Sequence, residues 1–333
     1  MFKKLILATT LLAFVVVVLG AFVRLSDAGL GCPDWPGCYG QLSPAHAHQE
    51  IAQAHAALPH GPVSPAKAWK EMAHRYLASS LGLLIIIIGS MAWLKREQLK
   101  QGLGLPIFLI GFVILQGLFG MWTVTLKLTP IIVTLHLLGG MITLALLTWL
   151  LQRQSTDIPA VRRVDAERIK PYALFALGVV FLQIALGGWV SSNYAALACP
   201  DFPTCKGVWL PPMDVQHAFQ LVRSLGMTAQ GVLLPNEALT AIHWVHRVGA
   251  MLTLLVVGLL AFKMLRMPAL ARAGIILVLV LSAQISLGIA NVLLSLPLPV
   301  AVAHNAVAAL LLLTLVMLVF RLKKALKRDY AGG

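Results

Sequence analysis

Long apolar runs that are almost free of charge constrain this chain more than any other feature of its sequence. A helix needs about 20 apolar residues to cross the hydrocarbon core of a bilayer, and windows of this kind follow one another along most of the chain. Only 11% of the 333 residues are charged and 59% are hydrophobic, whereas about a quarter of the residues in soluble domains are charged. The sequence excludes a soluble fold and predicts a bundle of membrane helices.

The positions of the runs predict eight crossings. Four windows are long enough for one helix each, and two longer windows, divided by prolines, are long enough for two each. The single windows are Leu5–Val23, Tyr76–Leu94, Pro171–Ser192 and Ala241–Phe262, and the double windows are Gln101–Gln152, divided near Pro130, and Ala273–Phe320, divided at Pro297 and Pro299.

The formal net charge of +14 would suggest nucleic acid as the partner of a soluble protein, but here we expect the lipid bilayer and no nucleic acid. Cytoplasmic loops of membrane proteins carry an excess of Lys and Arg. With the N-terminus inside, 18 of the 26 basic residues fall on the inner side, Lys100 among them, and 8 on the outer side: Arg24, Lys67, Lys70, Arg75, Lys127, Lys206, Arg223 and Arg247. Both termini are therefore expected in the cytoplasm.

A repeat divides the chain into two similar halves. Leu19–Gly40 reads LGAFVRLSDAGLGCPDWPGCYG and Leu186–Gly207 reads LGGWVSSNYAALACPDFPTCKG, with both cysteines, both prolines and the aspartate at the same offset. Four helices per copy give the copies the same orientation in the membrane. The expected fold is an all-α membrane protein of two tandem, parallel-oriented four-helix bundles, covering residues 1–165 and 166–333. The first apolar run is expected to be a retained helix, since the same segment recurs in mid-chain.

Four histidines occupy places that match between the copies. His74 and His246 each precede an arginine at the start of a helix, while His136 and His304 lie just inside the fourth helix of each half. Ionisable residues inside spans are costly and often functional, and facing imidazoles are a means of holding haem iron in a bundle. One haem site per half follows. The alternatives are hydrogen bonds to neighbouring helices or a bare metal, although two imidazoles are too few for a closed zinc site.

The copies differ beside these histidines. Glu71 precedes His74 by three residues and shares its helix face, whereas the second half has His243 at the equivalent place. Glu71 could act as an acid or base near an iron-bound substrate, or only as a carboxylate favoured at a helix start. Arg75 and Arg247 could pair with haem propionates, or extend to the membrane interface.

The four cysteines form two short loops on the predicted outer side, where disulfides persist. We expect bridges between Cys32 and Cys38 and between Cys199 and Cys205, with a structural role, although a redox role for the first pair is also open. The first outer loop also holds a group of histidines, which no recognised metal-ligand spacing connects: His46, His48, His55 and His60.

Together these motifs resemble the haem A synthase family. The likeness rests on the eight helices, the duplicated unit, the segment GAFVRLSDAGLGCPDWPGCYG, EMAHR at Glu71–Arg75, the second HR at His246–Arg247, and the single histidines His136 and His304. It implies an enzyme that oxidises a methyl substituent of haem O to the formyl group of haem A for terminal oxidases, with water as the source of oxygen.

The resemblance also implies roles for the matched residues. Glu71, His74 and His136 would form the site of the substrate haem O in the first half, and His246 and His304 would bind a haem b cofactor in the second. A haem O synthase and terminal oxidase assembly factors would be the partners. The lack of an Arg- and Ser-rich leader predicts a bacterial inner membrane rather than a mitochondrial one.

Two rival functions remain open from the sequence. A di-haem membrane cytochrome would carry electrons between quinol and a partner, but haems stacked across the bilayer would suit it, and all four histidines are expected near the outer face. A transporter built on parallel repeats would be expected to show broken helices and charges at the midplane, which the sequence does not clearly contain.

Overall fold

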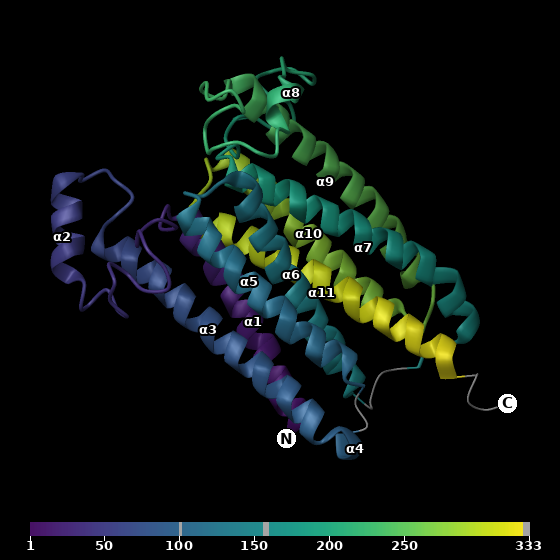
Figure 1. The fold of residues 1–333 in the computed structure, drawn as a ribbon. Helices are drawn as coiled ribbons and strands as arrows, with labels where there is room; N and C mark the ends of the chain where they lie inside the picture. The colour runs from purple at the N-terminus through teal and green to yellow at the C-terminus, as the bar shows by residue number, and fades with distance from the viewer. Residues whose placement is uncertain (100–101, 156–159, 329–333) are drawn as a thin grey trace.

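The computed structural model describes residues 1–99, 102–155 and 160–328, and these residues form an almost entirely helical protein (Figure 1). Eight helices within these ranges are long and apolar enough to cross a membrane, which confirms the predicted number of crossings and the all-α fold. They are α1 (Phe2–Leu25), α3 (Pro65–Leu94), α5 (Gly104–Thr125), α6 (Pro130–Arg153), α7 (Arg163–Ser192), α9 (Asn236–Leu265), α10 (Ala271–Leu293) and α11 (Leu298–Arg328). Lys100, assigned above to the inner side, and Gln101, the start of a predicted window, lie outside the described residues.

Helices α3 and α7 begin furthest ahead of their apolar windows. Helix α3 begins at Pro65 rather than Tyr76, with proline in its first turn and the Ser64 hydroxyl accepting a hydrogen bond from the Lys67 amide at 3.3 Å. Helix α7 begins at Arg163 rather than Pro171, so the boundary predicted after residue 165 falls inside its first turn. Lys67 lowers the hydropathy of the first turn of α3, while capping by Ser64 and proline at N1 still favours the helix. Charged residues also lower the hydropathy at the start of α7, where Arg162 donates to Asp165 at 2.8 Å.

The predicted breaks within the two long windows are tight turns. Lys127 and Leu128 have φ values of 47° and 58° between α5 and α6, and Ser295 and Leu296 have 57° and 61° between α10 and α11. Two consecutive residues in this left-handed region reverse the chain in very little length. The two helices of each pair are thereby placed side by side.

Contacts between helices run in the same order in both halves. Helices α1, α3, α5 and α6 form a ring in which α3 and α6 both contact α1 and α5, and so lie across the ring from each other. Helices α9 and α11 likewise both contact α7 and α10. The histidine-bearing helices of each half therefore occupy opposite positions of a four-helix ring. The assignment of separate tasks to the two halves stays a prediction.

The halves meet along α1, α6, α7 and α11, where α1 and α6 contact α11 and α6 also contacts α7. At the end of the bundle where α1 ends, Arg24 donates a hydrogen bond of 2.7 Å to the carbonyl of Ser191, which is its own equivalent in the repeat. The same guanidinium lies 3.9 Å from the centre of the Tyr194 ring. Contacts between equivalent positions are expected near an axis that relates two copies.

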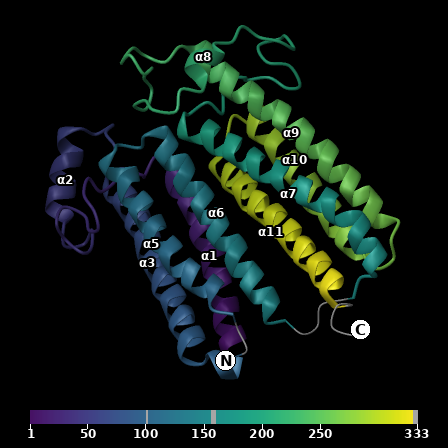
Figure 2. The same ribbon diagram turned by 45° about the vertical axis from the view of Figure 1, so that its right-hand side comes forward.

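The ends of the molecule differ in character. The connecting segments that contain the short helices α2 (His48–Ala57) and α8 (Val215–Ala218) lie at one end of the bundle, while α1 begins and α11 ends at the other (Figures 1 and 2). A third short helix, α4 (Arg96–Leu99), follows α3 at that second end. The large loops and both disulfides therefore share one side of the protein.

Candidate functional site

Helix α3 brings Glu71 under the disulfide loop that follows α1. The side chain is buried, with 4% of the residue exposed. Its Oε2 accepts a hydrogen bond of 2.9 Å from the amide of Cys32, and its Oε1 accepts one of 2.6 Å from Arg75, one turn further along the helix. The carboxylate is thereby held from both sides next to His74, as the shared helix face predicts.

The second half holds His243 in the same way. The amide of Cys199 approaches its Nδ1 at 3.2 Å, and Arg247 approaches its Nε2 at 3.3 Å. Glu71 and His243 thus occupy equivalent places, each between the first cysteine of a loop and the arginine that follows a site histidine. Only the first half offers a carboxylate there.

Arg75 and Arg247 attach the disulfide loops to the helices. Arg75 donates to the carbonyls of Asp34 at 2.8 Å and Gly37 at 2.5 Å. Arg247 donates to the carbonyls of Thr204 and Cys199, both at 2.7 Å. These donors are engaged within the protein, and a contact with haem propionates stays a prediction for both residues.

Both predicted disulfides are formed. Cys32 bonds Cys38 and Cys199 bonds Cys205, each closing a loop of the same separation in sequence. Both are on the side of the molecule that carries α2 and α8. We expect mass spectrometry of the protein, alkylated and digested without reductant, to recover both intra-loop bridges. Four alkylated free thiols would contradict the placement of these loops on the oxidising side of the membrane.

An aspartate closes each loop, a role that the sequence analysis did not assign. Asp34 accepts hydrogen bonds from the amides of Tyr39 and Gly40, both at 2.6 Å. Asp201 accepts from the amides of Lys206 at 2.5 Å and Gly207 at 2.9 Å and from the Thr204 hydroxyl. The signal was available, since Asp34 and Asp201 match in the repeat.

The second loop is expected to loosen in acid. The hydrogen bond from Thr204, followed by those from backbone amides, lowers the pKa of Asp201 from 3.8 to about 2. A lowered folded-state pKa stabilises the loop above the ordinary pKa, and this contribution is lost as the pH falls from about 4 toward 2. Amide exchange at Lys206 and Gly207, corrected for its intrinsic pH dependence, should accelerate in that window. In Asp201→Asn the acceleration should be absent, and an unchanged acceleration in that variant would contradict the assignment.

The four site histidines lie within about three turns of the N-terminal ends of their helices and are half-buried. His136 interacts electrostatically with His74, and His246 with His304. The two histidine pairs predicted from the sequence are therefore brought together, one pair in each four-helix ring. His243 also interacts with His246.

A glycine on a neighbouring helix faces each ring. A Cβ added at Gly20 would approach Cε1 of His74 to 2.9 Å, and one at Gly187 would approach Cε1 of His246 to 3.2 Å. The corresponding distances are 3.4 Å from Gly120 to His136 and 3.1 Å from Gly288 to His304. Any side chain at these glycines would press on the imidazole. Glycine therefore provides the space that each imidazole occupies within the bundle.

The histidine pairs fit a porphyrin iron better than a bare metal. Nδ1 of His74, His136 and His304 is buried without a hydrogen-bond partner among the described residues, so these rings keep a nitrogen for another ligand. In the part of the chain that the structure describes, no group of three or more His, Cys, Asp and Glu side chains could hold a metal ion, the loop histidines included. A porphyrin supplies four nitrogens itself, so two imidazoles complete its iron.

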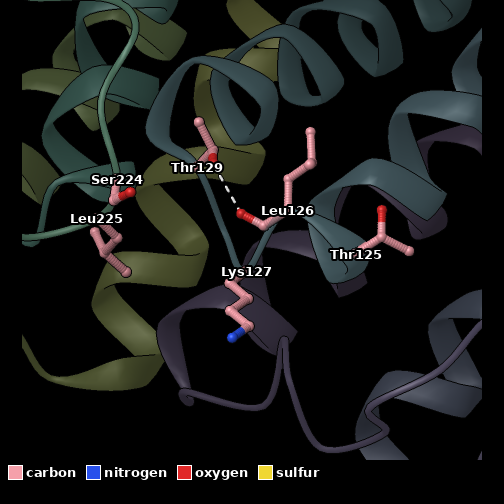
Figure 3. A pocket seen from close by; sticks show the side chains of 6 residues that line it. All are labelled: Thr125, Leu126, Lys127, Thr129, Ser224 and Leu225. Atoms are coloured by element: carbon pink, nitrogen blue, oxygen red, sulfur yellow. Dashed lines mark hydrogen bonds between the residues drawn. The ribbon is translucent and has the colours of Figure 1, made fainter. Parts of the chain in front are cut away.

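A separate polar pocket opens at the end of the bundle that carries α2 and α8, away from these residues. It is lined by the turn between α5 and α6 and by the second outer loop, with Thr129 donating to the carbonyl of Leu126 at 2.7 Å (Figure 3). Its lining residues are Thr125, Leu126, Lys127, Thr129, Ser224 and Leu225. None of the sequence-predicted site residues lines it.

Eight helices that are long and apolar enough to span a membrane, with a pair of half-buried histidines in each four-helix ring, define a multi-pass helical membrane protein. Comparison with known proteins identifies the family. The chain belongs to the COX15-CtaA family, described as cytochrome oxidase assembly protein, whose model matches residues 3–316.

Similar proteins of this family cover nearly the whole chain. A protein of Shewanella oneidensis named heme A synthase is 42% identical over 308 residues, 92% of each chain. Proteins of the same name from Shouchella clausii and Halalkalibacterium halodurans are each 28% identical, over 296 and 318 residues, and these matches cover 88% and 93% of this chain and 91% and 93% of the relatives.

Proposed function

We propose that this protein oxidises a methyl substituent of haem O to the formyl group of haem A, which terminal oxidases require. The structural observation that carries the proposal is the buried carboxylate of Glu71, held beside His74 in only one of two otherwise matched histidine sites. The relatives named heme A synthase support the same function. They favour it over the di-haem cytochrome that the sequence left open.

The first half is proposed as the substrate site. His74 and His136 would hold the iron of haem O from opposite helices of the ring. Glu71 already accepts hydrogen bonds from Arg75 and Cys32, but each carboxylate oxygen has a further lone-pair site. It can therefore accept a proton as water adds oxygen to the methyl carbon, which loses electrons and protons on its way to the aldehyde.

The second half is proposed as the cofactor site. His246 and His304 would hold haem b, which supplies a redox centre able to accept electrons when bound. His243 replaces the carboxylate there and is engaged by Arg247 and Cys199. That environment suits a resident cofactor rather than a reacting substrate. A haem O synthase and terminal oxidase assembly factors are the proposed partners, and a bacterial inner membrane with both termini in the cytoplasm is the proposed location.

Analysis of extracted haems tests this function directly. The full chain would be expressed in bacteria that make haem O but have no other source of haem A, and the extracted haems separated by chromatography. We expect haem A to accumulate at the expense of haem O. Unchanged haem O without haem A, in cells whose membranes contain the folded protein, would contradict the proposal.

A further inference from the structure

The helix that faces each site histidine has the same spacing. Four residues before each facing glycine, on the same helix face, lies a glutamine in three cases and a valine in one. The pairs are Gln116 with Gly120, Gln183 with Gly187, Gln284 with Gly288, and Val16 with Gly20. The single valine faces His74, which is the histidine beside Glu71.

The glutamine amide reaches two of the other site histidines: the Gln284 amide nitrogen lies 3.2 Å from Nε2 of the His304 ring, and Gln116 donates to the His136 carbonyl. The facing glycine lets the imidazole come close enough to reach this part of the helix. For His74 the backbone of Val16 is the only group that the position can provide, because valine has no polar side-chain atom.

His246 is held by a side chain. The amide nitrogen of Gln183 lies 3.1 Å from Nδ1 of the His246 ring and donates a hydrogen bond of 3.0 Å to the His246 carbonyl. One amide group thus contacts both the ring and the backbone of the same histidine. The amide therefore fixes the orientation of the imidazole relative to the backbone of α9. Gln183 does not contact Nε2, the other ring nitrogen.

A glycine makes room for this amide. The Oε1 atom of Gln183 lies only 2.2 Å from where a Cβ of Gly249 would stand, so any side chain at residue 249 would displace it. Gly249 follows His246 by three residues, and the residue that follows His74 by three is Leu77. Val16 and Leu77, both apolar, belong to the main hydrophobic core. The surroundings of His74 therefore have neither the amide nor the space for it. His136 in the same half has both, because Gln116 donates to the His136 carbonyl and lies against Gly139.

We propose that Gln183 and Gly249 act together as a positioning pair that fixes the His246 imidazole, and that Val16 and Leu77 leave His74 without such a pair. This inference rests on the proposed role of His246 as a ligand of haem b. Residues that orient a metal-ligating histidine raise the affinity of the site for its metal group. A clamped His246 suits a cofactor that stays bound, whereas His74, which faces Val16 in place of a glutamine, suits a substrate haem that must leave after each reaction.

The experiment compares two variants on different helices of the full chain, Gln183→Met and Gly249→Ala. The first removes the amide at constant side-chain length, and the second displaces it without altering Gln183. We expect haem b to be lost to excess apomyoglobin about 10-fold faster or more from both purified variants. The low-spin ferric signal in electron paramagnetic resonance and the midpoint potential should also shift, which a merely structural effect distant from the ring would not cause.

Gln152→Met is the matched control, since it makes the same substitution at the inner end of α6, about 24 Å along the helix from His136. It should retain haem b like the wild type. Haem b bound equally tightly, with the same spectrum and potential, in wild type, Gln183→Met and Gly249→Ala would overturn this inference and leave the proposed function standing. A wild-type chain purified without haem b would overturn both.

Discussion

Replacing Glu71 by glutamine is expected to abolish the formation of haem A while the fold and haem b binding persist. Glutamine has nearly the same shape, and its amide oxygen can still accept from the amide of Cys32. It has no carboxylate to accept a proton, and general acid–base catalysis contributes about 10²–10⁴-fold to a rate. The ratio of haem A to haem O, extracted from cells without another source of haem A, measures the loss.

The control for this prediction is Glu237→Gln in the first turn of α9, where the side chain is exposed. This variant makes the same chemical change outside the site and should form haem A at the wild-type level. If Glu71→Gln also formed haem A undiminished, Glu71 would not be the proton acceptor. Loss of haem b from Glu71→Gln would instead indicate that the carboxylate holds the structure together.

Replacing either His246 or His304 by alanine is expected to remove haem b from the purified protein. The two imidazoles come from α9 and α11, on opposite sides of the second ring of helices, and together they would hold the haem iron. Truncation of one leaves the iron with a single imidazole and a gap in the bundle. The pyridine haemochrome assay gives the amount of haem b per polypeptide. This amount should fall from a stoichiometric level in the wild type to a small fraction of it in each variant.

His48→Ala is the control for the histidine variants, because His48 is exposed at the start of α2. It should keep the haem b content of the wild type. Normal haem b content and an unchanged absorption spectrum in both His246→Ala and His304→Ala would reject these residues as the ligands. The haem would then have to be bound elsewhere in the chain.

The number and order of the helices could be predicted from the sequence, because a bilayer requires long apolar runs and the chain has few charges outside its loops. The starts of α3 and α7 could not. Their first turns hold charged residues, including Lys67 and Arg163, that lower the hydropathy without preventing a helix. The repeat predicted an equivalence that hydrophobic periodicity could not, namely that Glu71 corresponds to His243. The structure holds both residues in equivalent places.

The partners of the arginines and of the histidine rings were beyond prediction. Arg75 binds the carbonyls of Asp34 and Gly37, and backbone carbonyls leave no mark in a sequence. The matched glycines Gly20 and Gly187 were visible in the repeat, but only packing shows that each faces an imidazole. The position of Gln183 against Gly249 likewise depends on the relative rotation of α7 and α9, which sequence patterns do not determine.

The number of haems that the full chain can bind tests the central claim most directly, namely that each half holds one haem between its two histidines. Haem b titrated into the haem-depleted protein would be followed by absorption, with His74→Ala/His136→Ala and His246→Ala/His304→Ala as the two comparison variants. The account predicts two haems for the wild type and one for each double variant, through loss of a different site in each. A wild-type stoichiometry unchanged in both double variants would contradict it.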